Sequence, residues 1–300
     1  MNGDPAMTTP TLPAERFEAD RPRLRAIAHR MLGSLAEADD AVQETWLRAS
    51  RADLDEVENL TAWLTTVVSR VSLNMLRSRR TRREEPLETQ VGEAAVDAGE
   101  GADPEEEALQ ADSVGVALLV VLDTLNPDER LAFVLHDLFA VPFDTIAPLV
   151  ERTPAATRQL ASRARRRVRG GTPAPAADLA RQREVVDAFL AATRGGNFDA
   201  LLSLLHPDVV LTADRFVVPT PEPITLGGAR PVAHSAMAAT GRALFTGPAL
   251  LDGRVGLVMA PQGRLRLVLL FTVTDEGITR IDVVADQERL AGIEVAVLEG

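Results

Sequence analysis

The sequence predicts a multidomain protein in which two all-α segments precede an α+β domain. Apolar residues recur at helical spacing in residues 14–85 and again in residues 113–170. Beyond residue 178, helical patterns are joined by strand-like ones with Gly-containing turns. Strands are expected over residues 208–212, 251–259, 264–274 and 277–284, in a curved sheet with one buried face. We therefore expect six parts: a disordered N-terminus (1–13), a helical domain (14–85), an acidic linker (86–112), a second helical domain (113–170), a short linker (171–177) and an α+β domain (178–300).

Composition excludes several classes of protein. The 300 residues contain no cysteine, which rules out disulfides, thiolate metal sites and thiol nucleophiles. The four histidines are scattered without metal-ligand spacing, so we expect no metal and no cofactor. The first residues lack the basic start and apolar run of a signal peptide, and no apolar run is long enough to span a membrane. We expect a cytoplasmic protein.

The first helical domain is predicted to hold three helices and one basic end. Leu24, Ile27 and Met31 follow the helical period and mark the apolar face of the first helix. Ser34 is expected to cap the second helix, with Glu37 completing a capping box three residues later. The third helix has apolar residues at helical spacing and continues into an arginine-rich tail.

Residues 141–169, VPFDTIAPLVERTPAATRQLASRARRRVR, have the pattern of a helix-turn-helix. Thr153 can cap the second helix, and Pro154 suits the first helical position, where no N–H is needed. Pro148 inside the first helix is expected to bend it. Asn126 starts the helix that precedes the motif. Because such a motif lays its second helix in the major groove, these residues predict DNA binding.

Charge is strongly patterned along the chain. The net charge is −12, yet residues 70–83 hold six arginines and no acid, and residues 152–169 hold seven arginines and no acid. Residues 84–112 between them hold eleven acids and no base. The two basic patches predict two contacts with a polyanion. We interpret the acidic stretch as a solvated linker, with competition for the basic patches as the alternative.

Three long stretches carry a resemblance to a known family. LGSLAEADDAVQETWLRA and LTAWLTTVVSRVSLNMLRSRR resemble region 2 of extracytoplasmic-function (ECF) sigma factors, a group within the sigma-70 family of RNA polymerase sigma factors. The stretch that begins PDERLAFVLHDLF resembles region 4. The tail from about Asp178 resembles a SnoaL-like (NTF2-like) α+β cone domain, and the combination resembles the SigJ-like subgroup. TADRFVVPTPEP and ADQERL depart from motifs common in that subgroup.

The resemblance implies partners and site residues. The partners are core RNA polymerase and promoter DNA. The second helix of region 2 is expected to dock on polymerase through Asp39, Asp40, Gln43 and Glu44. The third is expected to contact the −10 element through Arg70, Asn74, Arg77, Arg79 and Arg80. The helix-turn-helix is expected to contact the −35 element through Ala155, Thr157, Arg158, Gln159, Ser162, Arg163 and Arg166.

The last domain is interpreted as a built-in regulator. His206, Asp214 and His234 are candidates for a ligand pocket, although no spacing forces them together. We expect no catalytic residue and a sigma factor that directs promoter-specific transcription initiation. Two alternatives stay open: an NTF2-like cyclase or isomerase fused to a DNA-binding module, and a one-component ligand-sensing repressor. The sequence does not say whether a small-molecule ligand or an anti-sigma protein acts on the chain.

Overall fold

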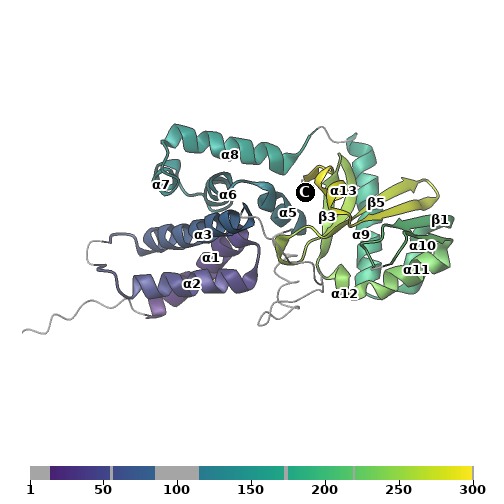
Figure 1. Ribbon diagram of the computed structural model, residues 1–300, viewed down its shortest axis with the longest axis horizontal. Helices are drawn as coiled ribbons and strands as arrows, with labels where there is room; N and C mark the ends of the chain where they lie inside the picture. The colour runs from purple at the N-terminus through teal and green to yellow at the C-terminus, as the bar shows by residue number, and fades with distance from the viewer. Residues whose placement is uncertain (1–13, 55–56, 85–114, 172–174, 219, 299–300) are drawn as a thin grey trace, which may run out of the picture. The chain divides into compact units, whose positions relative to one another are not determined.

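The computed structural model describes residues 14–54, 57–84, 115–171, 175–218 and 220–298 (Figure 1). The expected disordered N-terminus and acidic linker lie outside these residues, as does part of the short linker. The described residues form two compact units, one within residues 1–102 and 126–162 and the other within residues 103–125 and 163–300. No helix among the described residues is long and apolar enough to cross a membrane.

Three long helices form most of the first unit: α1 (Ala14–Leu32), α2 (Leu35–Ala49) and α3 (Leu60–Glu84) (Figure 1). Their inward faces are the ones that the helical period predicts, and the fully buried side chains include Leu24, Ile27 and Met31. The predicted capping box is wrong. Ser34 stands at the N-cap without a side-chain hydrogen bond, and Glu37 forms an ion pair with Arg79 instead.

Shorter helical pieces complete this unit. They are α6 (Pro127–Phe133), the π-helical turn η1 (Val134–Leu138), α7 (Phe143–Ile146), the 3-10 turn η2 (Ala147–Leu149) and the first part of α8 (Pro154–Arg169). Both predicted caps are confirmed. Asn126 accepts the backbone N–H of Glu129 at 2.8 Å, and Thr153 accepts that of Ala156 at 3.2 Å. Pro148 lies in η2, where the α-helix gives way to 3-10 geometry, as expected for a missing N–H.

The second unit is built on a seven-stranded sheet. Its strands are β1 (Leu205–Ala213), β2 (Ile224–Gly227), β3 (Thr246–Leu251), β4 (Arg254–Met259), β5 (Leu267–Thr274), β6 (Gly277–Val284) and β7 (Val295–Ala296). They lie in the order β2-β1-β6-β5-β4-β3-β7, and only β1 and β6 pair in parallel among them. Irregular register in β1 and β5 accompanies the bend of the sheet.

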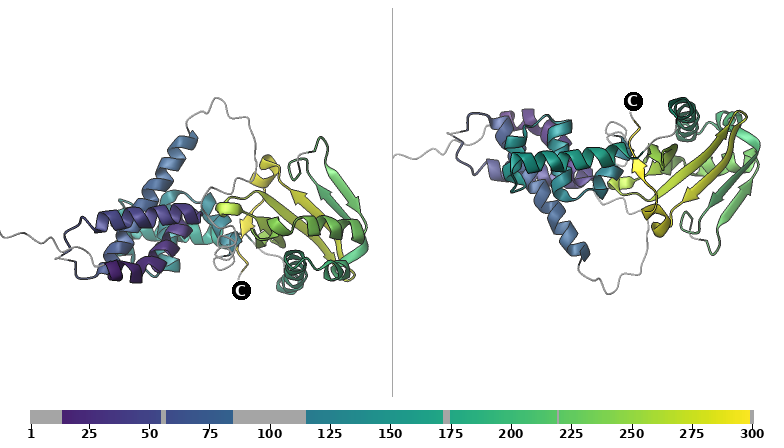
Figure 2. Two further views of the ribbon diagram at one scale, coloured as in Figure 1. Left: turned by 90° about the horizontal axis from the view of Figure 1, so that it is seen from below. Right: turned by 90° about the horizontal axis from the view of Figure 1, so that it is seen from above.

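Helices pack on both faces of this sheet (Figure 2). One face carries α9 (Ala176–Arg194), α10 (Phe198–Leu204), α11 (Ala229–Ala238) and α12 (Thr240–Ala243). The other carries α5 (Val116–Thr124) and α13 (Gln287–Ala291). The α+β fold class is thus confirmed. The expected segment 113–170, however, is divided between the two units, because α5 packs on the sheet.

Two strand expectations need correction. Residues 251–259 were expected to form one strand, but they belong to the β3–β4 hairpin, whose turn residues Asp252 and Gly253 both have positive φ. The sheet was expected to bury one face only. In β5, Phe271 packs with the helices of one face and Val268 packs with α5 on the other.

Candidate nucleic-acid interface

Helix α8 has exposed side chains along one face. Ala161 and Ala164 are fully buried and anchor the opposite face. The exposed side chains recur at intervals of three and four residues, so they project from one side of the helix. Six of the seven residues expected at the −35 element lie on this face: Ala155, Arg158, Gln159, Ser162, Arg163 and Arg166.

Thr157 is the exception on this helix. Its side chain is fully buried, and its hydroxyl donates to the backbone carbonyl of Thr153 at 3.0 Å. A buried hydroxyl that donates to a carbonyl in the preceding turn of its own helix cannot contact a DNA base. We therefore assign Thr157 to the packing of α8 and not to the −35 contact. Arg158 is held differently: its guanidinium lies over the ring of Phe143, 5.3 Å from the centroid. That ring in turn stacks on His136 at 3.7 Å.

Helix α3 divides the residues expected at the −10 element into two groups. Arg70, Asn74 and Arg77 are exposed at intervals of four and three residues and share one side of the helix. Arg77 also forms a 2.9 Å ion pair with Asp128 of α6. Arg80 is exposed further along. Arg79 is drawn inward by its ion pair with Glu37 and by the carbonyl of Leu32, so it positions α2.

Helix α2 carries the acidic side chains expected to contact polymerase. Asp39 and Asp40 are exposed, as is Gln43. Asp39 is engaged by Arg25 in a two-point ion pair at 2.6 and 3.0 Å, and Glu44 by Arg48 at 2.7 Å. Among the described residues, Asp40 has no such ion pair, and Gln43 is uncharged.

Leu47 was missed by the sequence analysis. It is 39% exposed, one turn beyond Gln43 and two turns beyond Asp40 on the same side of α2. An exposed leucine beside unpaired polar groups is typical of a protein-binding surface. The sequence spacing could have indicated this position, because Leu47 shares a side of the helix with the polar residues Asp40 and Gln43 and does not follow the spacing of the buried residues.

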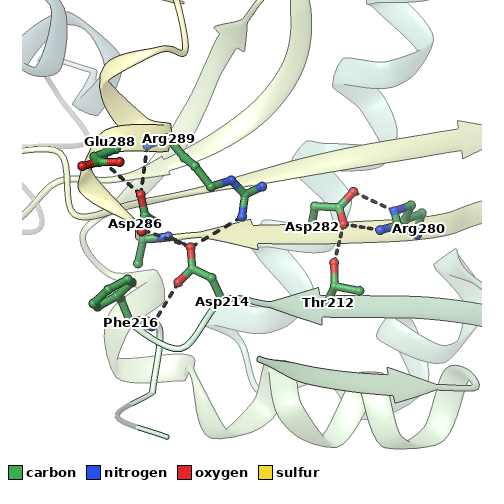
Figure 3. Close-up of polar contacts among 9 residues, drawn as sticks. Thr212, Asp214, Phe216, Arg280, Asp282, Asp286, Glu288 and Arg289 are labelled. Atoms are coloured by element: carbon green, nitrogen blue, oxygen red, sulfur yellow. Dashed lines mark hydrogen bonds and ion pairs between the residues drawn. The ribbon is translucent and has the colours of Figure 1, made fainter. Parts of the chain in front are cut away.

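In the second unit, Asp214 follows β1 and joins three segments (Figure 3). Its carboxylate accepts the backbone N–H groups of Phe216, Ala285 and Asp286 at 3.1, 2.8 and 2.9 Å. Burial acts to raise the pKa of Asp214, but these N–H donors and Arg289, 3.8 Å away, outweigh it and hold the pKa below its usual value. Asp214 therefore acts as an anchor that fixes the loop after β1 to the end of β6.

The two histidines that were candidates for a pocket together with Asp214 lie elsewhere. His206 pairs with Glu276 at 3.2 Å. His234 bonds the carbonyl of Arg230 within α11 and packs against Phe198. The three candidates do not converge on one site. Among the described residues no group of three or more potential ligands is placed to hold a metal ion.

A cavity of about 130 Å³ lies between the sheet and the helices of its first face. His206, Asp214 and His234 are not among its lining residues. The lining is mostly aliphatic, with side chains from α9, β1, α11, α12, β4, β5 and the loop after β1. Its polar members are Thr193, Ser235, Arg242 and Thr246. The sequence did not indicate this set, because it is assembled from separate elements.

Family models place the two helical parts. Residues 16–82 match sigma-70 region 2, and residues 115–168 match sigma-70 region 4. The chain is thus a sigma-70-type protein in both of its helical parts.

Comparison with curated relatives defines the group within that class. The chain is 45% identical over 204 residues to the ECF RNA polymerase sigma factor SigJ of Mycobacterium tuberculosis H37Rv, an alignment that covers 66% of this chain and 64% of the relative. It is 37% identical over 196 residues to the probable ECF sigma factor SigI of M. tuberculosis CDC 1551, covering 64% of this chain and 67% of the relative. The chain belongs to the ECF RNA polymerase sigma factor family.

Solved structures show similarity over longer and shorter parts. A crystal structure of M. tuberculosis SigJ aligns with 93% of this chain and 99% of its own, at 33% identity and a TM-score of 0.44. An NTF2-like protein of unknown function from Cytophaga hutchinsonii aligns with 37% of this chain and 94% of its own, at 15% identity and a TM-score of 0.26. In the C-terminal part of this chain, a bent seven-stranded sheet carries helices on both faces, which agrees with the expected α+β class.

Proposed function

We propose that this protein is an alternative sigma factor that binds core RNA polymerase and directs promoter-specific transcription initiation. In this proposal α3 contacts the −10 element and α8 the −35 element. The observation that carries the proposal is the exposed face of α8, where arginines and small polar side chains alternate at helical spacing. Arg158 and Gln159 stand at the start of this helix, where a recognition helix contacts base edges, and arginines further along suit phosphates.

The polymerase contact is proposed on α2. Asp40, Gln43 and Leu47 form an exposed stripe that combines charge, an amide and an apolar side chain. Charge complementarity would orient a basic partner surface, and the leucine would supply buried apolar area. A simple DNA-binding module has no need of such a stripe beside its basic helices. The stripe therefore supports a sigma factor over a one-component repressor.

The two DNA-contacting helices also argue against a repressor. A one-component repressor usually binds a palindrome as a symmetric dimer, with the same helix on both half-sites. Here α3 and α8 are unlike in sequence, and each has its own exposed basic face. Two different DNA-contacting helices in one chain suit a promoter with two unlike elements. Such a protein acts in the cytoplasm, with its polymerase.

The C-terminal domain is proposed as a built-in regulator without catalytic activity. General acid–base catalysis needs a titratable group within reach of a substrate atom. The Asp214 carboxylate is instead occupied by three backbone N–H groups, and the cavity lining contains no Asp, Glu or His. This arrangement supports ligand binding over a cyclase or isomerase reaction.

The proposal is tested by in vitro transcription with purified core polymerase on a pool of genomic promoters. Transcripts that depend on the protein and start at defined sites are expected, and they yield the bipartite element directly. Asp40→Arg should abolish most of this activity, whereas Glu58→Arg, a charge reversal at an exposed position outside α2, should leave it intact. A protein that only lowers transcription by a housekeeping holoenzyme would establish the repressor instead.

A further inference from the structure

The cavity of the C-terminal domain has a composition that specifies a ligand class. Its volume of about 130 Å³ is close to that of apolar protein cavities of about 150 Å³ that bind benzene. Side chains such as Phe189, Leu257 and Leu269 make most of its wall. The cavity therefore fits an apolar body of about one aromatic ring.

Two of the three hydroxyl groups in the lining donate away from the cavity. Thr193 donates its hydroxyl hydrogen to the carbonyl of Phe189 at 2.9 Å, and Thr246 donates to the carbonyl of Arg242, also at 2.9 Å. Each donor hydrogen is therefore used within a helix or at its end, and only lone pairs remain for a ligand. Ser235 supplies a third, neutral hydroxyl to the lining, so a charged hydrogen-bond donor must be another group.

Arg242 is that group. It is half-buried in α12, and its guanidinium donates one hydrogen bond, 3.3 Å long, to the carbonyl of Val217 in the loop after β1. A guanidinium has five N–H donors, so most are left for another acceptor. No acidic side chain is among the described residues that line the cavity, so none of them is a counter-ion for this cation. A partly desolvated cation at an apolar wall favours an anionic ligand group.

Exposed apolar side chains belong to the lining of the cavity or adjoin it along the chain. Within the described part of the second unit, the large hydrophobic residues that are exposed are Phe216, Val218 and Leu244, at 52%, 40% and 38%. Val218 itself lines the cavity, and the other two adjoin lining residues in the chain. Single exposed apolar side chains are common on protein surfaces, and it is their grouping near a cavity that suits a binding site. Their position suits the entry of a ligand with an apolar body.

We propose that this cavity is a binding site for a small carboxylic acid whose apolar body is the size of one ring, with Arg242 as the counter-ion of the carboxylate. The inference deepens the regulatory part of the proposed function. Its test measures binding alone, without polymerase or DNA, so its failure is separate from a failure of promoter-directed transcription.

The probe is benzoate, titrated calorimetrically into the full chain at neutral pH. Benzyl alcohol supplies the same ring without charge, and acetate supplies the charge without the ring. Benzoate is expected to bind more tightly than either. Arg242→Met should weaken benzoate about tenfold to a hundredfold, the value of a hydrogen bond to a charged group, and leave benzyl alcohol unchanged. Arg254→Met, at an exposed arginine that does not line the cavity, should change neither.

A second pair of variants tests the location without touching the charge. Ala236→Leu places a larger side chain in the cavity wall and should weaken both ring compounds, whereas Ala238→Leu, on the exposed side of α11, should not. Arg242→Lys keeps the charge and should retain a preference for benzoate over benzyl alcohol. The proposal is overturned if benzoate has no Kd below about 1 mM, or if Arg242→Met or Ala236→Leu binds it as the unaltered chain does.

Discussion

Arg158→Ala is the sharpest test of how α8 reads DNA. The side chain is exposed at the start of the helix and its guanidinium is positioned over the ring of Phe143. A bidentate arginine–guanine contact contributes about 1–3 kcal/mol of base discrimination, so its loss lowers affinity for the preferred site about fivefold to a hundredfold. The contact over Phe143 is worth about 0.5–1 kcal/mol at an exposed position and helps to hold the guanidinium in place.

The assay is binding of polymerase holoenzyme to promoters with single base changes in the −35 element, at one fixed salt concentration. Arg158→Ala should flatten the preference at one position and leave the others unchanged. Arg166→Ala, further along the helix, should weaken all promoters alike. Phe143→Leu keeps the guanidinium but removes its support, and should show a smaller loss at the same position. An unchanged preference profile in Arg158→Ala would refute the assignment.

Three further predictions concern the elements that hold the sites. Burial and the nearby Arg30 and Arg25 lower the pKa of His29 from 6.5 to about 4. Between these values the unfolded chain binds a proton that the folded chain excludes, so the free energy of unfolding should fall by about 2 kcal/mol between pH 7.5 and 5.0. Urea titrations at the two pH values should show this loss, and His29→Leu should lack it. Asp214→Asn should cost about 1–3 kcal/mol because one or more backbone N–H groups lose their acceptor, seen as a lower Tm than in Asp208→Asn. Leu47→Ser should weaken competition for core polymerase about fivefold or more, whereas Leu138→Ser, at a leucine of similar exposure, should not.

Much of the helical structure was predictable because its determinants are local. The apolar period of α1 and the caps at Asn126 and Thr153 depend on residues within one or two turns, and each forms as expected. The exposed face of α8 follows from the same period. Thr157 was misassigned because exposed and buried threonines look alike in sequence. Its burial depends on which way the helix is rotated against its neighbours.

The sheet was harder to predict because its determinants are distant. The dipeptide Asp252-Gly253 is a strong signal for a hairpin turn. The prediction of one strand over residues 251–259 overlooked it and so merged the end of β3 with β4. The cavity has a different cause. Its wall joins residues nearly a hundred positions apart, such as Phe189 and Val283, so no local pattern distinguishes them from an ordinary core. The family resemblance predicted Asp39, Asp40, Gln43 and Glu44 of α2 as the polymerase contact. Which of these acids are already in ion pairs depends on the positions of Arg25 and Arg48 in the fold.

Helix α5 shows where the family match and the packing differ. It falls within the sigma-70 region 4 match, yet Val116 and Val120 form one apolar cluster with Val258 and Val268 of the sheet. The approach is close: a Cβ added to Gly247 of β3 would lie 3.0 Å from the Cβ of Val116. The C-terminal domain therefore supplies part of the core for a helix that the sequence assigns to region 4.

Deleting everything beyond Gly171 is consequently a poor test of regulation. It removes the sheet from Val116 and Val120, which are each about 3% exposed, and exposing two such side chains costs about 3–6 kcal/mol. The truncated chain should show rapid amide exchange and proteolysis at α5. A loss of promoter activity would then reflect the destabilised helix and not the loss of a regulatory domain. Gly247→Val is the finer perturbation, because it loosens α5 from β3 while the cavity is left in place. A truncated chain in which α5 stays as protected as in the full chain would show that the sheet does not stabilise this helix.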